Sequence, residues 1–176
     1  MPGKCIIGGE KMSNINKQTR MPSNADWTGY EEDLDLQDFY KLVYGKKVED
    51  IYYYFKNSAH ISRADELLHS NRKVFQYYIY AFALYIEVAG EKEPDVLDVF
   101  LRLLLNREKK DIGSVCQIYH KKYNFQIVDE NFDKKSFTLS LESIVEKIMN
   151  RLDEGMIDKE IYSDFPELIN NVKNMC

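Results

Sequence analysis

The sequence predicts an all-α fold: a compact globular bundle of seven or eight helices around a buried central helix, with a flexible N-terminal tail. From Leu34 to the end of the chain, apolar residues recur every three or four positions, which is the spacing of one face of a helix. Only eight glycines and four prolines occur in 176 residues, which argues against a loop-dominated architecture. The stretch Phe125–Val128 indicates a strand, but four residues are too few to change the predicted fold class.

The chain divides at about residue 30. Residues 1–30 hold four of the eight glycines and carry a net charge of +2, from four basic and two acidic residues. We interpret them as a mobile or loosely docked tail, whose end Trp27 and Tyr30 hold against the domain, because large aromatic side chains are costly to leave in water. Residues 31–176 are predicted to form a single all-α domain, a length that suits one core.

The first helices are predicted from apolar stripes and stop signals. A stripe from Leu36 to Val43 precedes Gly45, and glycine suits the position just after a helix end. The range Val48–Phe55 repeats the helical spacing. Ser62, followed three residues later by Asp65, matches a capping box and predicts the start of a short helix there.

The segment Asn71–Ala89 is predicted to be the buried central helix. It is apolar on nearly every side and ends at Gly90. Its apolar part contains Gln76 and Glu87 and is short for a transmembrane helix, so we expect no membrane span. A helix that is apolar all round is otherwise a buried one.

The later helices follow from similar signals. Pro94 suits the first turn of a helix, and a further stripe after Asp111 is expected to reach Tyr123. The range Leu141–Leu152 has the clearest late helical spacing. Asp164 stands three residues before a glutamate, which predicts the start of the last helix.

Composition also restricts the class of protein. Three cysteines cannot form a disulfide framework and no secretory leader is visible, which favours a soluble protein of a reducing, intracellular compartment such as the cytoplasm. The net charge of -5 argues against nonspecific nucleic-acid binding. The sequence lacks P-loop, GxGxxG, GxSxG and HExxH motifs, so it favours a noncatalytic protein and leaves open an enzyme without a recognised motif.

Tyrosine is abundant, and nine of the 13 tyrosines lie between Tyr40 and Tyr85. The consecutive tyrosines point to adjacent helical faces, so not all of these rings can enter one core. They form either a recognition surface or an aromatic-rich core with outward hydroxyls. The leading hypothesis is a helical protein–protein interaction module without a cofactor, whose tyrosine-rich surface or groove receives a helix or short peptide; homo-oligomerisation stays open. The candidate partner-binding residues are Tyr40, Tyr44, Tyr52, Tyr53, Tyr54 and Tyr77.

The alternative hypothesis is a helical globule that binds a ligand or cofactor, and calcium is one candidate. Asp129, Asn131 and Asp133 occupy positions 1, 3 and 5 of an EF-hand loop between two expected helices. Lys134 stands where that loop needs glycine, and Ser140 stands where it needs a bidentate glutamate. The pattern is therefore that of a degenerate calcium loop or of a solvated acidic turn.

Haem is the other candidate. Phe55, His69 and His120 resemble the groups of a globin haem pocket, which implies His120 as proximal ligand and His69 as distal group. The range Arg107–Val145 resembles the later helices of an annexin repeat, and Ile118–Tyr119 together with the late Phe165 resembles a regulator of G-protein signalling domain. Three different helical families fit about equally well, so the spacing identifies none of them.

Overall fold

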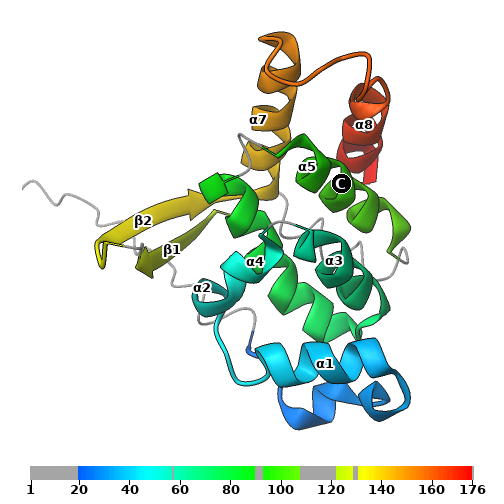
Figure 1. Cartoon of the computed structure of the whole chain (residues 1–176), viewed down its shortest axis with the longest axis vertical. Coiled ribbons are helices and arrows are strands. Elements are labelled where there is room, and N and C mark those ends of the chain that lie inside the picture. Colours follow the sequence, from blue (N-terminus) through cyan, green and yellow to red (C-terminus); the bar gives the residue numbers. More distant parts are fainter. Residues whose placement is uncertain (1–19, 57, 90–92, 108–121, 129–130, 176) are drawn as a thin grey trace, which may run out of the picture.

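Helices dominate the described part of the chain, as the apolar spacing predicts (Figure 1). The computed structural model describes residues 20–56, 58–89, 93–107, 122–128 and 131–175. In chain order the elements, with η for a 3-10 helix, are η2 (Asn24–Trp27), η3 (Tyr30–Glu32), α1 (Leu34–Val43), α2 (Val48–Ile51), η4 (Tyr52–Phe55), α3 (Ala59–His69), α4 (Arg72–Ala89), α5 (Pro94–Asn106), β1 (Tyr123–Val128), β2 (Lys134–Leu139), α7 (Leu141–Asp153) and α8 (Phe165–Met175).

Local signals set several of the helix ends. The Asp33 side chain caps α1 by accepting hydrogen bonds from the backbone N–H groups of Asp35 and Leu36, at 2.9 and 3.1 Å. Gly45, just beyond the end of α1, has the left-handed φ of +73° that the sequence suggested for a stop residue. Pro94 begins α5, as predicted. The backbone N–H groups of the first turn form no hydrogen bonds within the helix, so the N–H that proline lacks is not needed there.

The predicted start of α3 is wrong. The helix begins at Ala59, three residues before Ser62, so Ser62 lies inside it rather than at its cap. The cause is burial of the first turn: His60 is only 8% exposed, and packing extends the helix beyond its local signal.

The all-α prediction holds for most of the described chain, and the exception is an antiparallel two-stranded sheet of β1 and β2; β1 contains the stretch Phe125–Val128 that indicated a strand. Tyr123 pairs with Leu139 and Val128 pairs with Lys134. Along β1, buried and exposed residues alternate strictly, which is the period of a strand. Tyr123 therefore begins a strand, although its spacing from Tyr119 suggested a helix; the rest of that expected helix lies outside the described residues.

The core is centred on apolar residues of several helices, and α4 contributes a continuous run to it. Every residue from Tyr78 to Ile86 is buried, so this stretch of α4 has no solvent-facing side. The helix contacts η2, α2, η4, α3, α5, α7 and β2. The ring of Tyr80 meets the hairpin through Tyr123, with 4.7 Å between ring centroids.

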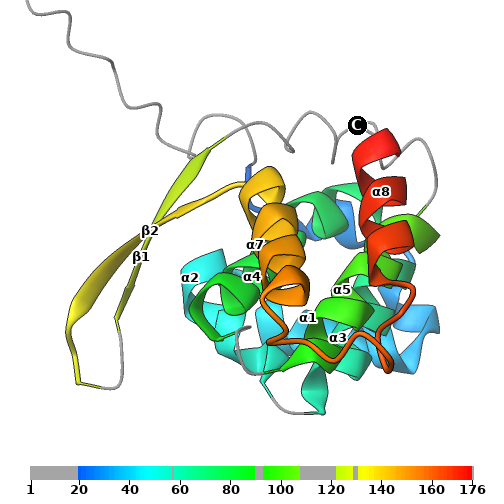
Figure 2. The same ribbon diagram turned by 90° about the horizontal axis from the view of Figure 1, so that it is seen from above.

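The two ends of the molecule are built from opposite ends of the chain. In Figure 1, η2 and η3 lie with α1 at one end and α7 and α8 lie at the other, while the start of β2 stands away from the helices. Figure 2, viewed from a second direction, also shows β1 and β2 extending away from the helices. Within the described ranges, none of the helices combines the length and the apolar character needed to cross a membrane.

The described part of the predicted tail is held against the domain. Trp27 is 3% exposed, and its ring lies 5.8 Å from that of Phe39 and 6.2 Å from that of Tyr78. The sequence expectation that Trp27 packs on the domain is therefore confirmed. Residues 1–19 lie outside the described residues.

Candidate functional site

A column of three tyrosine rings runs along one side of α1. The rings of Tyr30 and Tyr40 stack with centroids 4.2 Å apart and planes 18° apart, and those of Tyr40 and Tyr44 stack at 4.5 Å and 27°. Tyr40 and Tyr44 share a helix face because they are four residues apart. Gly29, with φ of +85°, makes the turn that leads into Tyr30. We call Tyr30, Tyr40 and Tyr44 the tyrosine column.

The tyrosine column is partly open to solvent and is held in place. Tyr44 is 40% exposed, and the other two rings are half-buried. The hydroxyl of Tyr40 donates a 3.1 Å hydrogen bond to Oδ1 of Asn24. Desolvation, and then the neighbouring Tyr30 and Tyr44 hydroxyls, raise the pKa of Tyr40, so the ring stays neutral. The column therefore offers neutral, preordered rings to solvent.

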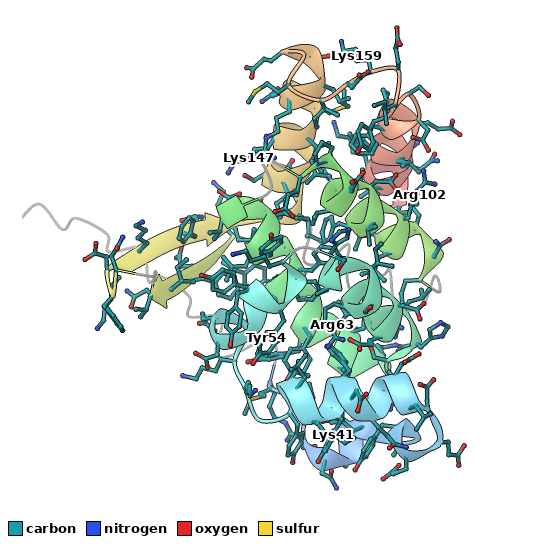
Figure 3. All side chains as sticks on the ribbon, viewed as in Figure 1. Lys41, Tyr54, Arg63, Arg102, Lys147 and Lys159 are labelled. Atoms are coloured by element: carbon teal, nitrogen blue, oxygen red, sulfur yellow. The ribbon has the colours of Figure 1, made fainter. Side chains whose placement is uncertain are left out.

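A second group of tyrosines lies on η4, and we call Tyr52, Tyr53 and Tyr54 the tyrosine turn. The rings of Tyr53 and Tyr54 meet edge to face at 4.4 Å, and Tyr53 is 49% exposed. Lys46, from the loop that joins α1 to α2, donates a 3.3 Å hydrogen bond to the Tyr54 hydroxyl and lies 5.4 Å from its ring centroid. Figure 3 shows Tyr54 between α2 and α1 in that view. The loop containing Lys46 thus links the end of the tyrosine column to the tyrosine turn.

The two hydroxyls at the tyrosine turn are not equivalent. The hydrogen bond from Tyr53, and then the Lys46 ammonium, lower the pKa of Tyr54. The same hydrogen bond raises the pKa of Tyr53 to about 12, since that hydroxyl is the donor. The Tyr54 hydroxyl also accepts the 3.3 Å hydrogen bond from Lys46.

The remaining candidate, Tyr77, lies at the boundary between surface and core. Its ring is half-buried and meets Tyr78 edge to face at 4.9 Å. Tyr78, Tyr80 and Tyr85 are buried. The nine tyrosines from Tyr40 to Tyr85 are thus divided: those late in α4 belong to the core, and the six candidates each keep some exposure.

The surface around the tyrosines is acidic. Residues 30–54 contain seven acidic and three basic side chains, a net charge of -4. All ten are exposed or half-buried, and Lys41 forms a 3.0 Å ion pair with Asp38 on α1 (Figure 3). The charged residues are Glu31, Glu32, Asp33, Asp35, Asp38, Glu49, Asp50, Lys41, Lys46 and Lys47.

A cavity of about 150 Å³ adjoins the tyrosine column, because Tyr30 belongs to both. Trp27 and Ser70 give it a buried wall, and four other lining residues are exposed, so it opens to solvent. The lining residues are Trp27, Thr28, Gly29, Tyr30, Leu36, His69, Ser70 and Asn71. Sequence reasoning missed this cavity because its walls come from three separate chain segments.

Asn71 holds two of those segments together, its own and that of Trp27–Tyr30. Its Nδ2 donates to the backbone oxygens of Asp26 and Thr28 at 3.0 and 2.9 Å, and to Oγ1 of Thr28 at 3.0 Å. The side chain of Asp26 in turn pairs with Lys73 at 2.9 Å. The Lys73 hydrogen bond, followed by hydrogen bonds from Ser23, lowers the pKa of Asp26 far below its ordinary value, so this link stays ionic.

The predicted haem residues are only partly placed. His69 lies on the rim of the cavity, with Nε2 3.5 Å from Oδ1 of Asp65. His120 lies outside the described residues, so the pair stays a prediction. The cavity beside His69 is smaller than the roughly 300–1,000 Å³ of ordinary ligand pockets.

Two of the three predicted calcium residues, Asn131 and Asp133, lie at the hairpin rather than between two helices. Asp129 is outside the described residues, and Asn131 and Asp133 are exposed where the chain turns from β1 to β2. The expected helical surroundings of an EF-hand loop are therefore wrong. In the ranges that the structure covers, no three His, Cys, Asp or Glu side chains gather into a possible metal site.

Comparison with known proteins found no matching family model, no similar curated protein and no similar solved structure.

Proposed function

We propose that this chain is a noncatalytic protein-interaction module whose tyrosine column and tyrosine turn bind a helix or short peptide of a protein partner. The observation that carries the proposal is the tyrosine column itself: neutral rings stacked in a fixed order and partly exposed. Tyrosine is enriched in protein interfaces because it brings a large contact area at a low cost in conformational entropy.

Charge indicates the kind of partner. The net charge of -4 over residues 30–54 accounts for most of the chain's net charge of -5. A basic segment would gain from these carboxylates, and its lysine or arginine side chains could lie over tyrosine faces. The partner segment we propose is therefore basic.

The scaffold of this surface is a bundle in which helices surround α4. Support comes from the burial of Tyr78–Ile86 on all sides and from the contacts of α4 with elements before and after it in the chain. Tyr77 belongs to this helix, and its half-buried ring meets that of Tyr78 edge to face.

The test replaces the two most exposed tyrosine rings of the proposed surface. Tyr44→Ser together with Tyr53→Ser removes rings that are 40% and 49% exposed, so the fold should survive. Phe132→Ser is the matched control, because Phe132 is 88% exposed at the hairpin turn. Affinity capture from the native lysate identifies the partner, and titration with the purified partner then measures affinity, with urea unfolding as the check on folding.

The proposal expects the unsubstituted protein and Phe132→Ser to bind alike and the double variant to lose at least tenfold in affinity while remaining folded. Equal binding by the double variant would contradict it. Light scattering distinguishes self-association: a halved mass in the double variant would make a second copy the partner.

A further inference from the structure

A chain of aromatic contacts leads from the core to the surface through the tyrosine column. The rings of Trp27 and Tyr40 meet edge to face with 5.1 Å between centroids, and the ring of Tyr40 stacks on that of Tyr44 at 4.5 Å. Trp27 is 3% exposed, whereas Tyr44 is 40% exposed. Two ring contacts thus connect a buried indole to a phenol that water reaches, and electrons cross such short contacts between aromatic rings readily.

The indole of Trp27 lies where it can lose an electron but cannot lose the proton of its nitrogen. Its Nε1–H is a donor only, is buried, and has no acceptor among the described residues. Removal of one electron therefore leaves a radical cation that keeps its proton. An unpaired charge in an apolar core is costly, so the oxidised indole is driven to take an electron from a neighbouring ring.

The neighbouring phenols differ in whether they can release a proton together with the electron. The hydroxyl of Tyr78 donates to a backbone oxygen at 2.7 Å, and that of Tyr40 donates to the amide oxygen of Asn24 at 3.1 Å. Both acceptors are neutral carbonyl oxygens, which are weak bases, so neither can take the proton away. Tyr44 is partly exposed, so its proton can pass to water. An oxidised Trp27 is therefore repaired at lowest cost by an electron from Tyr44.

We propose that Trp27, Tyr40 and Tyr44 form a one-electron relay that moves an oxidation from the core to the surface. When a one-electron oxidant removes an electron from the indole of Trp27, an electron passes from Tyr44 through the ring of Tyr40 to the indole. The hydroxyl proton of Tyr44 goes to water. The products are the restored indole, the phenoxyl radical of Tyr44 and one proton. A soluble hydrogen-atom donor such as ascorbate then restores the phenol of Tyr44.

Pulse radiolysis of the full chain tests the relay, with the azide radical as the oxidant. This radical oxidises indole faster than phenol at neutral pH, and Trp27 is the single tryptophan of the sequence, so the oxidation begins at one known ring. The absorption of the indole radical should decay as that of a phenoxyl radical rises, with a first-order rate constant that is independent of protein concentration. A rate that rises with protein concentration would show transfer between molecules and would overturn the relay.

A spin trap locates the phenoxyl radical. Tyr53 is the internal control, because it is 49% exposed and its ring meets those of Tyr52 and Tyr54 and not that of Trp27. Peptide mass spectrometry should find the adduct of the trap on Tyr44 at several times its level on Tyr53. Equal adducts on the two residues would show direct oxidation of exposed rings and would contradict the relay.

Variants test the order of the rings. Tyr44→Phe removes the terminal hydroxyl and should lengthen the lifetime of the indole radical at least tenfold, and Tyr40→Leu should do the same because it removes the connecting ring. Tyr162→Phe is the matched control, because the half-buried ring of Tyr162 meets that of Phe165, away from the tyrosine column, and should leave the lifetime unchanged.

If Tyr40→Leu does not fold, the kinetics of Tyr44→Phe and the position of the adduct in the unsubstituted protein decide the matter. An unchanged lifetime in Tyr44→Phe, or an adduct on Tyr30 in place of Tyr44, would overturn Tyr44 as the end of the relay. These measurements use the protein alone, so their outcome is independent of whether the tyrosine column binds a partner.

Discussion

The hydroxyl of Tyr78 donates a 2.7 Å hydrogen bond to the backbone oxygen of Val43 and a 3.3 Å hydrogen bond to that of Lys46. A buried ring of α4 thus satisfies the carbonyl groups at the C-terminal end of α1 and of the loop that follows. Burial raises the pKa of Tyr78 well above its ordinary value, which keeps the hydroxyl a donor. The candidate surface is fixed to the core at this point.

Removing that hydroxyl should destabilise the fold. Tyr78→Phe keeps the ring contacts with Trp27 and Phe39 but removes the hydroxyl donor from both backbone oxygens, of which that of Val43 retains a 3.0 Å hydrogen bond from the backbone N–H of Lys46. We expect the free energy of unfolding to fall by about 1–2 kcal/mol in urea titrations. Tyr44→Phe, at an exposed ring, should change it by less than about 0.5 kcal/mol. Equal effects of the two substitutions would contradict the capping role of Tyr78.

Arg107 should be far more sensitive to substitution than Arg102. Arg107 is 8% exposed; its guanidinium donates to the backbone oxygens at the end of α3 and lies 4.5 Å from the ring centroid of Phe75. The ammonium group of lysine cannot donate to these backbone oxygens in the planar geometry of a guanidinium group. Arg107→Lys should therefore lower the free energy of unfolding by about 2–3 kcal/mol.

Arg102 makes the matched exposed control. Its side chain is 48% exposed and joins Asp98 of α5 to Asp164, at distances of 2.9 and 2.5 Å (Figure 3). Because exposed ion pairs contribute little, Arg102→Lys should cost less than about 1 kcal/mol. Thermal and urea unfolding of both variants measure the difference. A larger loss of stability in Arg102→Lys would show that the buried guanidinium group of Arg107 is dispensable.

Glu66 should make stability depend on pH. It is 4% exposed, and its Oε1 lies 2.7 Å from a guanidinium nitrogen of Arg63. Burial raises the pKa of Glu66 from the usual 4.5 to about 8; Arg63 opposes the shift, and the carboxylates of Asp35, Asp38 and Asp65 add to it. Between pH 4.5 and about 8, Glu66 is therefore protonated in the folded protein and ionised in the unfolded chain.

The direction of the pH dependence follows from the proton that Glu66 binds in the folded state. Since the folded state binds more protons than the unfolded state between pH 4.5 and about 8, stability should fall as pH rises through this window, by at most about 1.4 kcal/mol per pH unit. Glu66→Gln should flatten the curve, measured by urea unfolding at a series of pH values. Glu167→Gln, an exposed position on α8, should leave the slope unchanged. If the free energy of unfolding of Glu66→Gln still fell with rising pH at the same slope, the pH dependence would come from other titratable groups.

The parts of the fold predicted from the sequence are those that depend on local signals. Gly45 and Pro94 act within their own turns, so the end of α1 and the start of α5 could be predicted. Strand β2 could not, because three consecutive residues from Lys134 are exposed and its identity depends on pairing with β1.

The candidate site was predictable to the same extent. Tyrosine abundance indicated a surface, and the spacing of Tyr40 and Tyr44 put their rings on one helix face. The contribution of Tyr30 and the cavity beside it depend on hydrogen bonds from Asn71 to a distant segment, which no local pattern encodes.

The docking of Trp27 also has a consequence for the order of events during synthesis. Asn71 follows Asp26 by 45 residues, and Trp27 packs against a ring of α4. The segment Asn24–Trp27 is made early but acquires these contacts only after α4 has left the ribosome. Translation therefore exposes the single indole of the chain until the helix that shelters it emerges, and a pause before α4 would prolong that exposure.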